Sequence, residues 1–373
     1  MRLCLMVLGS MLAVSTTAAA GPPAVIALVE QMGPGDPPRD LALLGADGSR
    51  AVLLDHLPLG GYQLAVHPGT GRWALSFGQL SNGDPLVIAG KAVSKPLDRN
   101  TLVLGDRDGV VTITAGDPGC TSKKRACFET PRWFSTDGAY VFILAESSSR
   151  AVLSRWVWGK RPTRAAITDA RHGGLALAPD LTRASYVADD GVHVIALAPQ
   201  KAKATKVTLS PRAVVNPRLL MSDAWPIGSR LYWFRREPAK QQRGYFEAYD
   251  LDTGRTVALH EATADFPMMR GGFLATGARG TVIFGDDVGF ERFDVYETTA
   301  DGARAIAHDV HQLLDVSADG RYLLATRRTD PAHGEALANP ESLVIIDLDS
   351  DQDVATLAVG AAAKVDQARF IAR

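Results

Sequence analysis

Ser317-Ala-Asp-Gly-Arg-Tyr-Leu-Leu-Ala325 joins a short polar turn, which ends in Gly and a basic residue, to the start of an apolar strand. The same pattern recurs in His67-Pro-Gly-Thr-Gly-Arg-Trp-Ala-Leu-Ser-Phe77, in Ser135-Thr-Asp-Gly-Ala-Tyr-Val-Phe-Ile-Leu144 and in Ala178-Pro-Asp-Leu-Thr-Arg-Ala-Ser-Tyr186. A repeat spaced by tens of residues indicates an array of similar small units that bury their apolar faces against one another. Because each unit reads as turn and strand, the sequence predicts an all-β array.

The composition agrees with many short strands joined by tight turns. Hydrophobic residues make up 46% of the 373 residues, and the chain has 35 Gly and 21 Pro. Apolar residues alternate or run in stretches of four to eight, bounded by Gly, Asp, Asn and Pro, and helical periodicity is nearly absent. This composition excludes a disordered chain, and a closed repeat array of this length can form one domain.

The expected strands group in fours, and each group is one blade of a ring. We number the strands of a blade A to D from the middle of the ring outward. Six complete blades are expected at Tyr62–Thr114, Arg132–Ile167, Gly174–Leu209, Arg218–His260, Arg270–Ala307 and His311–Leu357.

The two ends of the chain hold the pieces of a seventh blade. Three strands precede the first complete blade, at Val25–Glu30, Asp40–Leu44 and Arg50–Leu54, and one strand follows the last, at Gln367–Ala372. Joining them in one sheet removes exposed strand edges. The sequence therefore predicts a single seven-bladed β-propeller, closed by N- and C-terminal strands in a shared blade. If the insert Gly78–Asn100 is assigned differently, the count becomes six or eight.

The turn pattern also resembles a known repeat. Asp137-Gly138-Ala139-Tyr140 and Asp319-Gly320-Arg321-Tyr322, with weaker copies at Pro179-Asp180 and Gly69–Trp73, resemble the WD40-like (PD40) repeat of TolB-type propellers. The same repeat is similar to that of the propeller domain in prolyl oligopeptidase relatives. The resemblance implies a bacterial envelope or secreted propeller that docks other molecules. Nothing in the sequence resembles the catalytic domain of the peptidases, since a Gly-x-Ser-x-Gly elbow is absent.

The first twenty residues have the features of a secretory signal peptide. Arg2 provides a positive start, Leu3–Val14 is mostly apolar, and Ala18-Ala19-Ala20 is a small-residue cleavage site before Gly21. A retained anchor is the alternative, but the apolar run is shorter than the roughly 20 residues that span a bilayer. We expect residues 1–20 to be removed and residues 21–373 to form the propeller, a monomer without a transmembrane segment, in the periplasm or outside the cell.

The charge balance excludes one class of partner. The chain has 40 basic and 41 acidic residues, for a net charge of −1, which gives no support for binding to nucleic acid. Lys123-Lys124-Arg125 is the one dense cationic run, and a solvated loop explains it more simply than a polyanion site.

Cys120 and Cys127 are the two cysteines of the expected mature chain. In an oxidising compartment they are expected to form a disulfide that closes a small loop. The alternative is a metal pair, for which neighbouring His or Cys ligands are lacking. A bridge here would stiffen a loop, and a stiff loop loses less entropy when it binds a partner.

Long segments concentrate on one predicted face. Connections from strand B to C and from D to A share a face, which receives Gln31–Arg39, Gly78–Asn100, Gly116–Pro131, Arg235–Gly244 and Arg327–Glu341. Long loops in compact domains are often functional, although neutral insertion also lengthens loops. The leading hypothesis is a non-catalytic propeller that binds a protein or an envelope component through this face, without a cofactor. The first contact candidates are Lys123, Lys124, Arg125, Arg235, Arg236, Lys240 and Arg243.

A second hypothesis is an enzyme. Histidine and aspartate recur at the D to A connections, where side chains could converge at the mouth of the central channel and hold a divalent metal. The site of such a metal-assisted hydrolase or lyase would use His56, His172, His308 and His311. None of these has a strong metal signature, so hydrogen bonds that tie blade ends together explain them more simply. A third hypothesis is a structural envelope component without a specific ligand.

Overall fold

A computed structural model describes the chain from residue 21 to residue 372, with gaps. The described residues are 21–31, 39–57, 62–77, 87–88, 91–92, 102–114, 128–135, 137–147, 150–158, 165–170, 175–180, 182–188, 191–197, 205–208, 224–236, 244–262, 273–276, 279–289, 292–300, 302–328, 341–360 and 363–372. Within these ranges the assigned elements are all β-strands. The expected signal peptide at residues 1–20 lies outside them.

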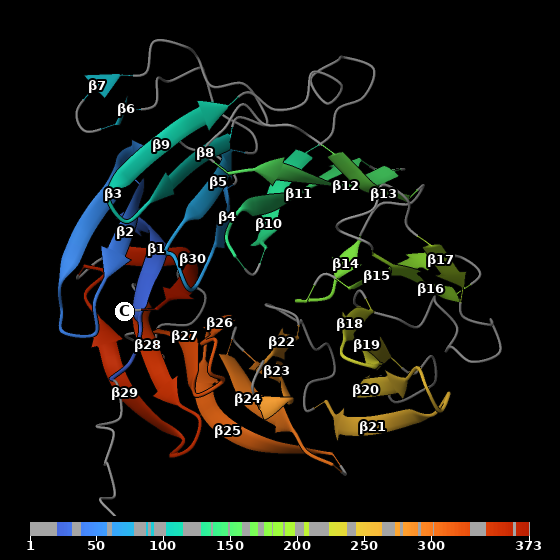
Figure 1. Ribbon diagram of the computed structural model, residues 1–373. Coiled ribbons are helices and arrows are strands. Elements are labelled where there is room, and N and C mark those ends of the chain that lie inside the picture. Colours follow the sequence, from blue (N-terminus) through green and yellow to red (C-terminus); the bar gives the residue numbers. More distant parts are fainter. Residues whose placement is uncertain are drawn as a thin grey trace, which may run out of the picture.

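Seven four-stranded antiparallel sheets form a ring around a central axis (Figure 1). This arrangement confirms the predicted seven-bladed β-propeller. Blades two and three are β4 (Tyr62–Val66), β5 (Trp73–Phe77), β8 (Leu102–Asp106), β9 (Gly109–Thr114); and β10 (Phe128–Phe134), β11 (Tyr140–Ser147), β12 (Arg150–Val157), β13 (Ala165–Ala170). Blades four and five are β14 (Ala176–Leu177), β15 (Arg183–Ala188), β16 (Gly191–Ala196), β17 (Thr205–Thr208); and β18 (Trp225–Ile227), β19 (Arg230–Arg236), β20 (Gly244–Asp250), β21 (Thr256–Glu261). Blades six and seven are β22 (Leu274–Ala275), β23 (Val282–Gly289), β24 (Arg292–Thr298), β25 (Ala303–Val310); and β26 (Gln312–Val316), β27 (Tyr322–Arg328), β28 (Glu341–Asp347), β29 (Gln352–Leu357).

Blade one closes the ring as expected from the leftover strands. Its order from the outside inward is β3 (Arg50–Leu57), β2 (Arg39–Leu44), β1 (Ala24–Gln31) and β30 (Ala363–Ile371). The C-terminal strand is therefore the innermost strand of a sheet whose other three strands come from the N-terminal part of the chain. The pairing runs from Ala24 opposite Ile371 to Gln31 opposite Ala363, with one bulge after Leu28.

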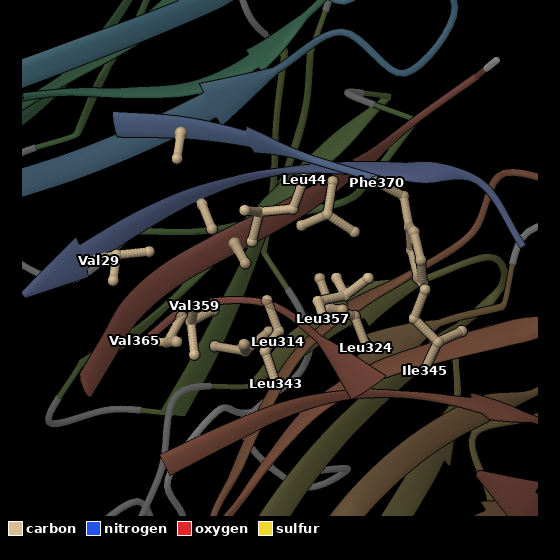
Figure 2. Packing of buried hydrophobic residues seen from close by; sticks show 14 of the residues in the cluster. Val29, Leu44, Leu314, Leu324, Leu343, Ile345, Leu357, Val359, Val365 and Phe370 are labelled. Atoms are coloured by element: carbon tan, nitrogen blue, oxygen red, sulfur yellow. The ribbon is translucent and has the colours of Figure 1, made fainter. Parts of the chain in front are cut away.

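Each boundary between neighbouring blades holds its own apolar cluster, and there are seven clusters for seven boundaries. The alternation of side chains along a strand produces this division. In β27, Tyr322 and Leu324 pack toward blade one, whereas Leu323 and Ala325 pack toward blade six. The blades are thus buried on both faces, and Figure 2 shows the cluster at the closing boundary, where Phe370 of β30 lies near residues of blade seven.

The recurring turn has the same hydrogen bonds in blades three and seven. In blade seven the Ser317 hydroxyl donates to the Asp319 carboxylate at 2.5 Å and accepts from the Tyr322 amide at 2.8 Å, and the Arg321 amide donates to Asp319 at 3.1 Å. Ser135 and Asp137 make the equivalent bonds in blade three. Gly320 has a φ of 72°, a conformation that is costly for residues with a Cβ atom. The pattern therefore specifies the turn from strand A to strand B.

The basic residue at the end of this turn joins neighbouring blades. The Arg72 guanidinium of blade two donates to the carbonyl of Gly138 in blade three at 2.8 Å. Arg183 of blade four donates to the carbonyl of Gly228 in blade five at 3.1 Å. These bonds satisfy turn carbonyls of the next blade, so the repeat also sets how blades pack side by side.

Candidate functional site

The strand topology assigns every connection to one of two faces. Turns from A to B and from C to D lie on one face, and the longest connection there covers residues 197–204. Connections from B to C and from D to A lie on the other face. Measured between the described strands, five of those, at 78–101, 115–127, 209–224, 262–273 and 329–340, are each longer than any connection on the opposite face. We call this the long-connection face.

Two of these five connections were not expected from the sequence. Blade five was predicted from Arg218 and blade six from Arg270, and their first described strands begin at Trp225 and at Leu274. Among the described strands, the two faces therefore differ more in the length of their connections than the sequence indicated.

Side-chain hydrogen bonds join β30, the last strand of the chain, to the inner strands of blades two and seven on its two sides. Gln367 of β30 donates from Nε2 to the Tyr62 carbonyl at 2.5 Å and accepts from the Leu64 amide at 2.8 Å. On the other side, the Phe370 amide donates to Asp315 at 2.8 Å. Inner strands have a free edge toward the channel, so these side chains satisfy backbone groups that no further strand pairs. Burial raises the pKa of Asp315, and the nearby Arg369 opposes this shift.

Charged side chains gather where β30 begins, on the long-connection face. Arg39 of β2 pairs with Glu30 at 2.6 Å and with Asp366 at 3.5 Å. Its guanidinium also lies over the Tyr62 ring, 5.7 Å from the centroid. Burial raises the pKa of Asp366, Arg39 opposes the shift, and Glu30 adds to it. These two ion pairs of Arg39 join the closing strand, β30, to β1 and β2 of the same blade.

A histidine and a glutamate from blade seven are buried beside this group. His311 Nε2 lies 3.2 Å from Glu341 Oε1, and both side chains are almost fully buried. The other carboxylate oxygen of Glu341 accepts from the Val365 amide of β30 at 3.3 Å. This pair connects the start of strand A and the start of strand C in blade seven to the closing strand.

A second buried pair crosses the boundary between blades five and six. His260 Nε2 of β21 lies 2.9 Å from Asp286 Oδ2 of β23, whose side chain has no exposed surface. The His260 ring lies 4.1 Å from the Tyr296 ring, centroid to centroid. Burial raises the pKa of Tyr296, and the charges of Asp286 and Asp294 add to this. The pairing was not foreseen, because its members lie in different blades and no local spacing connects them.

The candidate metal-binding histidines lie in different places. His56 is on β3 and His308 on β25, which are outer strands, and their nearest carboxylates are Asp55 at 3.7 Å and Asp294 at 3.0 Å. His311 precedes an inner strand and pairs with Glu341. His172 lies outside the described residues. In the part of the chain that the structure describes, no three His, Cys, Asp or Glu side chains form a group that could hold a metal ion. The metal site stays a prediction.

Two of the candidate contact residues are described. The Arg235 guanidinium at the end of β19 bonds Glu247 at 2.9 Å and lies over the Tyr245 ring, 5.1 Å from its centroid. Arg236 follows it and is partly buried. Both end strand B on the long-connection face. The remaining candidates lie outside the described residues, as do both cysteines: Lys123, Lys124, Arg125, Lys240, Arg243, Cys120 and Cys127.

No helix within the described ranges is both long enough and apolar enough to cross a membrane. No protein-family model and no curated protein sequence matches the chain.

Solved structures do match it. The chain is similar to a prolyl endopeptidase (12% identity, TM-score 0.50), covering 92% of this chain and 50% of that one. It is similar to a hypothetical selenium-binding protein from Sulfolobus tokodaii (10% identity, TM-score 0.51), covering 94% of each chain. It is also similar to TolB from Acinetobacter baumannii (12% identity, TM-score 0.44), covering 94% of this chain and 83% of that one.

The chain thus spans about half of the length of the endopeptidase that it matches. At these identities the likeness shows the fold alone. The match to the endopeptidase confirms, at that level, the expected resemblance to the propellers of prolyl oligopeptidase relatives.

Proposed function

We propose that the chain is an exported, non-catalytic β-propeller that binds a protein or a cell-envelope partner through the long-connection face. One observation carries the proposal: five connections on this face are longer than any connection on the other. A rigid scaffold that holds variable loops on one side is a common design for binding. The hydrogen bonds that hold the closing strand and the seven apolar clusters between blades make this scaffold rigid.

The contact residues proposed for this face are Lys123, Lys124, Arg125, Arg235, Arg236, Lys240 and Arg243. Export through the signal peptide at residues 1–20 would allow a disulfide between Cys120 and Cys127, and this bridge would stiffen connection 115–127 before binding. The site of action is then the periplasm or the cell exterior. The Glu247 carboxylate holds the Arg235 side chain in place, which lowers the entropy that the side chain would lose on binding.

Affinity capture from envelope extract tests this function. The bait is the chain from residue 21 with both cysteines, and two variants have connection 115–127 or 237–243 replaced by a short turn. A matched control has connection 197–204, on the opposite face, replaced in the same way. A partner that is retained by the parent and the control and lost by the two loop variants supports the proposal. Equal capture by all four proteins contradicts the choice of face.

The alternative function is a metal-assisted hydrolase or lyase at the channel mouth. One observation favours it: His311 lies at the start of an inner strand and is paired with the buried carboxylate of Glu341, as histidines that act as ligands or bases commonly are. Stoichiometric divalent metal in the purified protein, lost in His311→Ala, would support this alternative. Protein without metal would count against it.

A further inference from the structure

The pairing of the closing strand β30 with β1 has one irregularity, and it lies at Asp366. The residues before and after it, Val365 and Gln367, pair with two consecutive residues of β1, so Asp366 is the extra residue of a β-bulge. In a regular strand, residues 365 and 367 would point to the same face of the sheet. The bulge separates them: Val365 packs toward blade seven (Figure 2), whereas Gln367 bonds the inner strand of blade two.

The bulge adds the Asp366 carboxylate to a row of charges that crosses blade one. Arg39 of β2 lies opposite Glu30 of β1, and Glu30 in turn lies opposite Lys364 of β30. Opposite charges in such cross-strand positions stabilise a sheet. Asp366 is a second carboxylate beside this row, and its side chain is only 28% exposed. The strands that close the ring therefore hold two acidic and two basic side chains together at one end.

The guanidinium of Arg39 binds the two carboxylates unequally. Its Nε and Nη2 atoms donate to Glu30 at 2.9 and 2.6 Å, whereas Nε lies 3.5 Å from Asp366 Oδ2. Charge-assisted hydrogen bonds of arginine are strong at roughly 2.7–2.9 Å, so Asp366 is the less well compensated of the two carboxylates. Burial raises the pKa of Asp366, Arg39 opposes this shift, and Glu30 adds to it.

Other charged and titratable groups surround this end of β30. The elements packed against β30 contribute, at the long-connection face, Tyr62 of β4, Arg327 and Arg328 of β27, Glu341 of β28, and His311, which precedes β26. Glu341 adds to the rise in the pKa of Asp366, and Lys364 of β30 itself opposes it, both less than Arg39 and Glu30 do. Asp315 of β26 lies at the other end of β30, against the Phe370 amide. Burial and the charges of blade one therefore dominate the ionisation of Asp366.

We propose that Asp366 is a proton-sensitive latch, a group whose protonation tightens the closure of the ring. The paired β30 accommodates the neutral carboxyl of Asp366 more readily than the carboxylate, which is largely buried and held by Arg39 only at long distance. The stabilisation from this group is complete below the pKa that Asp366 has in the unfolded chain, and it is lost as the pH rises through the folded pKa. The start of β30 is thus held most tightly in acid and loosens as Asp366 ionises.

Hydrogen exchange at a series of pH values tests the latch in the isolated protein. The test variant is Asp366→Asn, which cannot ionise, and the matched control is Asp353→Asn, which loses a carboxylate paired with Arg327 on an outer strand. The ratio of exchange rates, parent over variant at the same pH, cancels the intrinsic pH dependence of exchange. For amides of β1 and the start of β30, this ratio should rise by about threefold or more from acid to neutral pH, because only the parent opens more easily.

The control ratio in these strands should stay constant with pH. A ratio for Asp366→Asn that stays flat or falls as the pH rises would overturn the latch, and so would an equal rise in all seven blades.

A second measurement does not depend on the folding of Asp366→Asn. NMR of the Asp366 carboxyl carbon should give a pKa above the ordinary value for aspartate in the parent. Glu30→Gln removes the neighbouring negative charge and frees the Arg39 guanidinium for Asp366, so the pKa of Asp366 should fall in this variant. A parent pKa at or below the ordinary value, or an unchanged pKa in Glu30→Gln, would contradict the latch. Because no partner takes part, a failed latch leaves the proposed binding function intact, and failure of partner capture leaves the latch intact.

Discussion

Gln367, six residues before the C-terminus, holds the backbone of Tyr62 across more than 300 positions of sequence, with its amide nitrogen 2.5 Å from the Tyr62 carbonyl oxygen. The same side chain accepts from the Leu64 amide. One residue therefore joins the last strand of the chain to the inner strand of blade two. Together with Asp315 on the other side, it makes the closing strand part of a continuous inner ring.

Replacement of Gln367 should weaken the closure of the ring. Gln367→Ala removes both bonds and leaves two half-buried backbone groups without a partner, so we expect a loss of about 1–3 kcal/mol in the free energy of unfolding. Urea titration followed by tryptophan fluorescence measures this loss. Gln63→Ala, an exposed glutamine on the adjoining strand, is the matched control. Equal stability of the two variants would argue against a stabilising role for the two hydrogen bonds of the Gln367 side chain.

Gly320 should be sensitive to a single added carbon. A Cβ atom at Gly320 would lie 2.3 Å from the Thr276 carbonyl oxygen of blade six, whereas one at Gly280 would meet nothing within 4 Å, and φ is similar at 72° and 68°. Gly280→Ala should cost about 1–2 kcal/mol from its backbone conformation alone. Gly320→Ala should cost about 1–3 kcal/mol more, because the clash adds strain. Thermal unfolding of the two variants compares the costs, and equal losses would be inconsistent with close packing of turns between blades.

Neutralising Asp315 should not harm the protein at neutral pH. Burial raises the pKa of this carboxyl above its unfolded value, with Arg369 in opposition. The folded state therefore binds the proton more tightly, and stability from this group falls as pH rises from the unfolded pKa through the folded one. Asp315→Asn keeps an oxygen that can accept from the Phe370 amide. We expect the variant to be at least as stable as the parent at pH 7, with a difference that shrinks at acid pH.

The free energies of unfolding at pH 7 and pH 4 measure that difference. A variant that is less stable than the parent at pH 7, by a margin that narrows as the pH is lowered, would show that the charge of Asp315 stabilises the fold and would contradict this account.

The pKa of Asp137 should be shifted in the direction opposite to that of Asp315. The hydroxyl of Ser135 and the amide of Ala139 lower the pKa of its carboxyl, because both donate to the ionised form. Its contribution to stability is present above the unfolded pKa and is lost as pH falls through the folded pKa. NMR titration should give a pKa below the ordinary value for aspartate, and Ser135→Ala should raise it. An unchanged pKa in this variant would exclude the turn hydroxyl as the cause.

The ring could be predicted from the sequence because the residues that indicate each turn and strand lie close together along the chain. Turn residues such as Asp319 and Gly320 mark blades two, three, four and seven, and the surplus of three strands at one end and one strand at the other admits one simple closure. The pairing of β6 (Val87–Ile88) with β7 (Lys91–Ala92) was not predicted. Short apolar runs are compatible both with a blade strand and with an insertion, and only the pairing of strands separates the two.

The candidate sites were harder to predict than the fold. His311–Glu341 and His260–Asp286 are contacts between strands or blades, and their members lie 30 and 26 positions apart without a common motif. The sequence placed His56 and His308 at D to A connections and led us to expect them at the channel mouth, but both lie on outer strands, β3 and β25, at the perimeter of the ring. The face that we propose for binding, in contrast, follows from connection lengths and strand order alone.

The ratio of binding affinities on the two faces tests the central claim most directly. The partner's Kd would be measured by titration calorimetry for the parent, for the protein with the long connection 115–127 replaced by a short turn, and for the protein with 197–204 replaced. Our proposal predicts that the Kd rises by about tenfold or more for the first variant, which is a loss of about 1.4 kcal/mol, and stays unchanged for the second. A Kd that rises only for the second variant would place the partner on the opposite face and contradict the proposal.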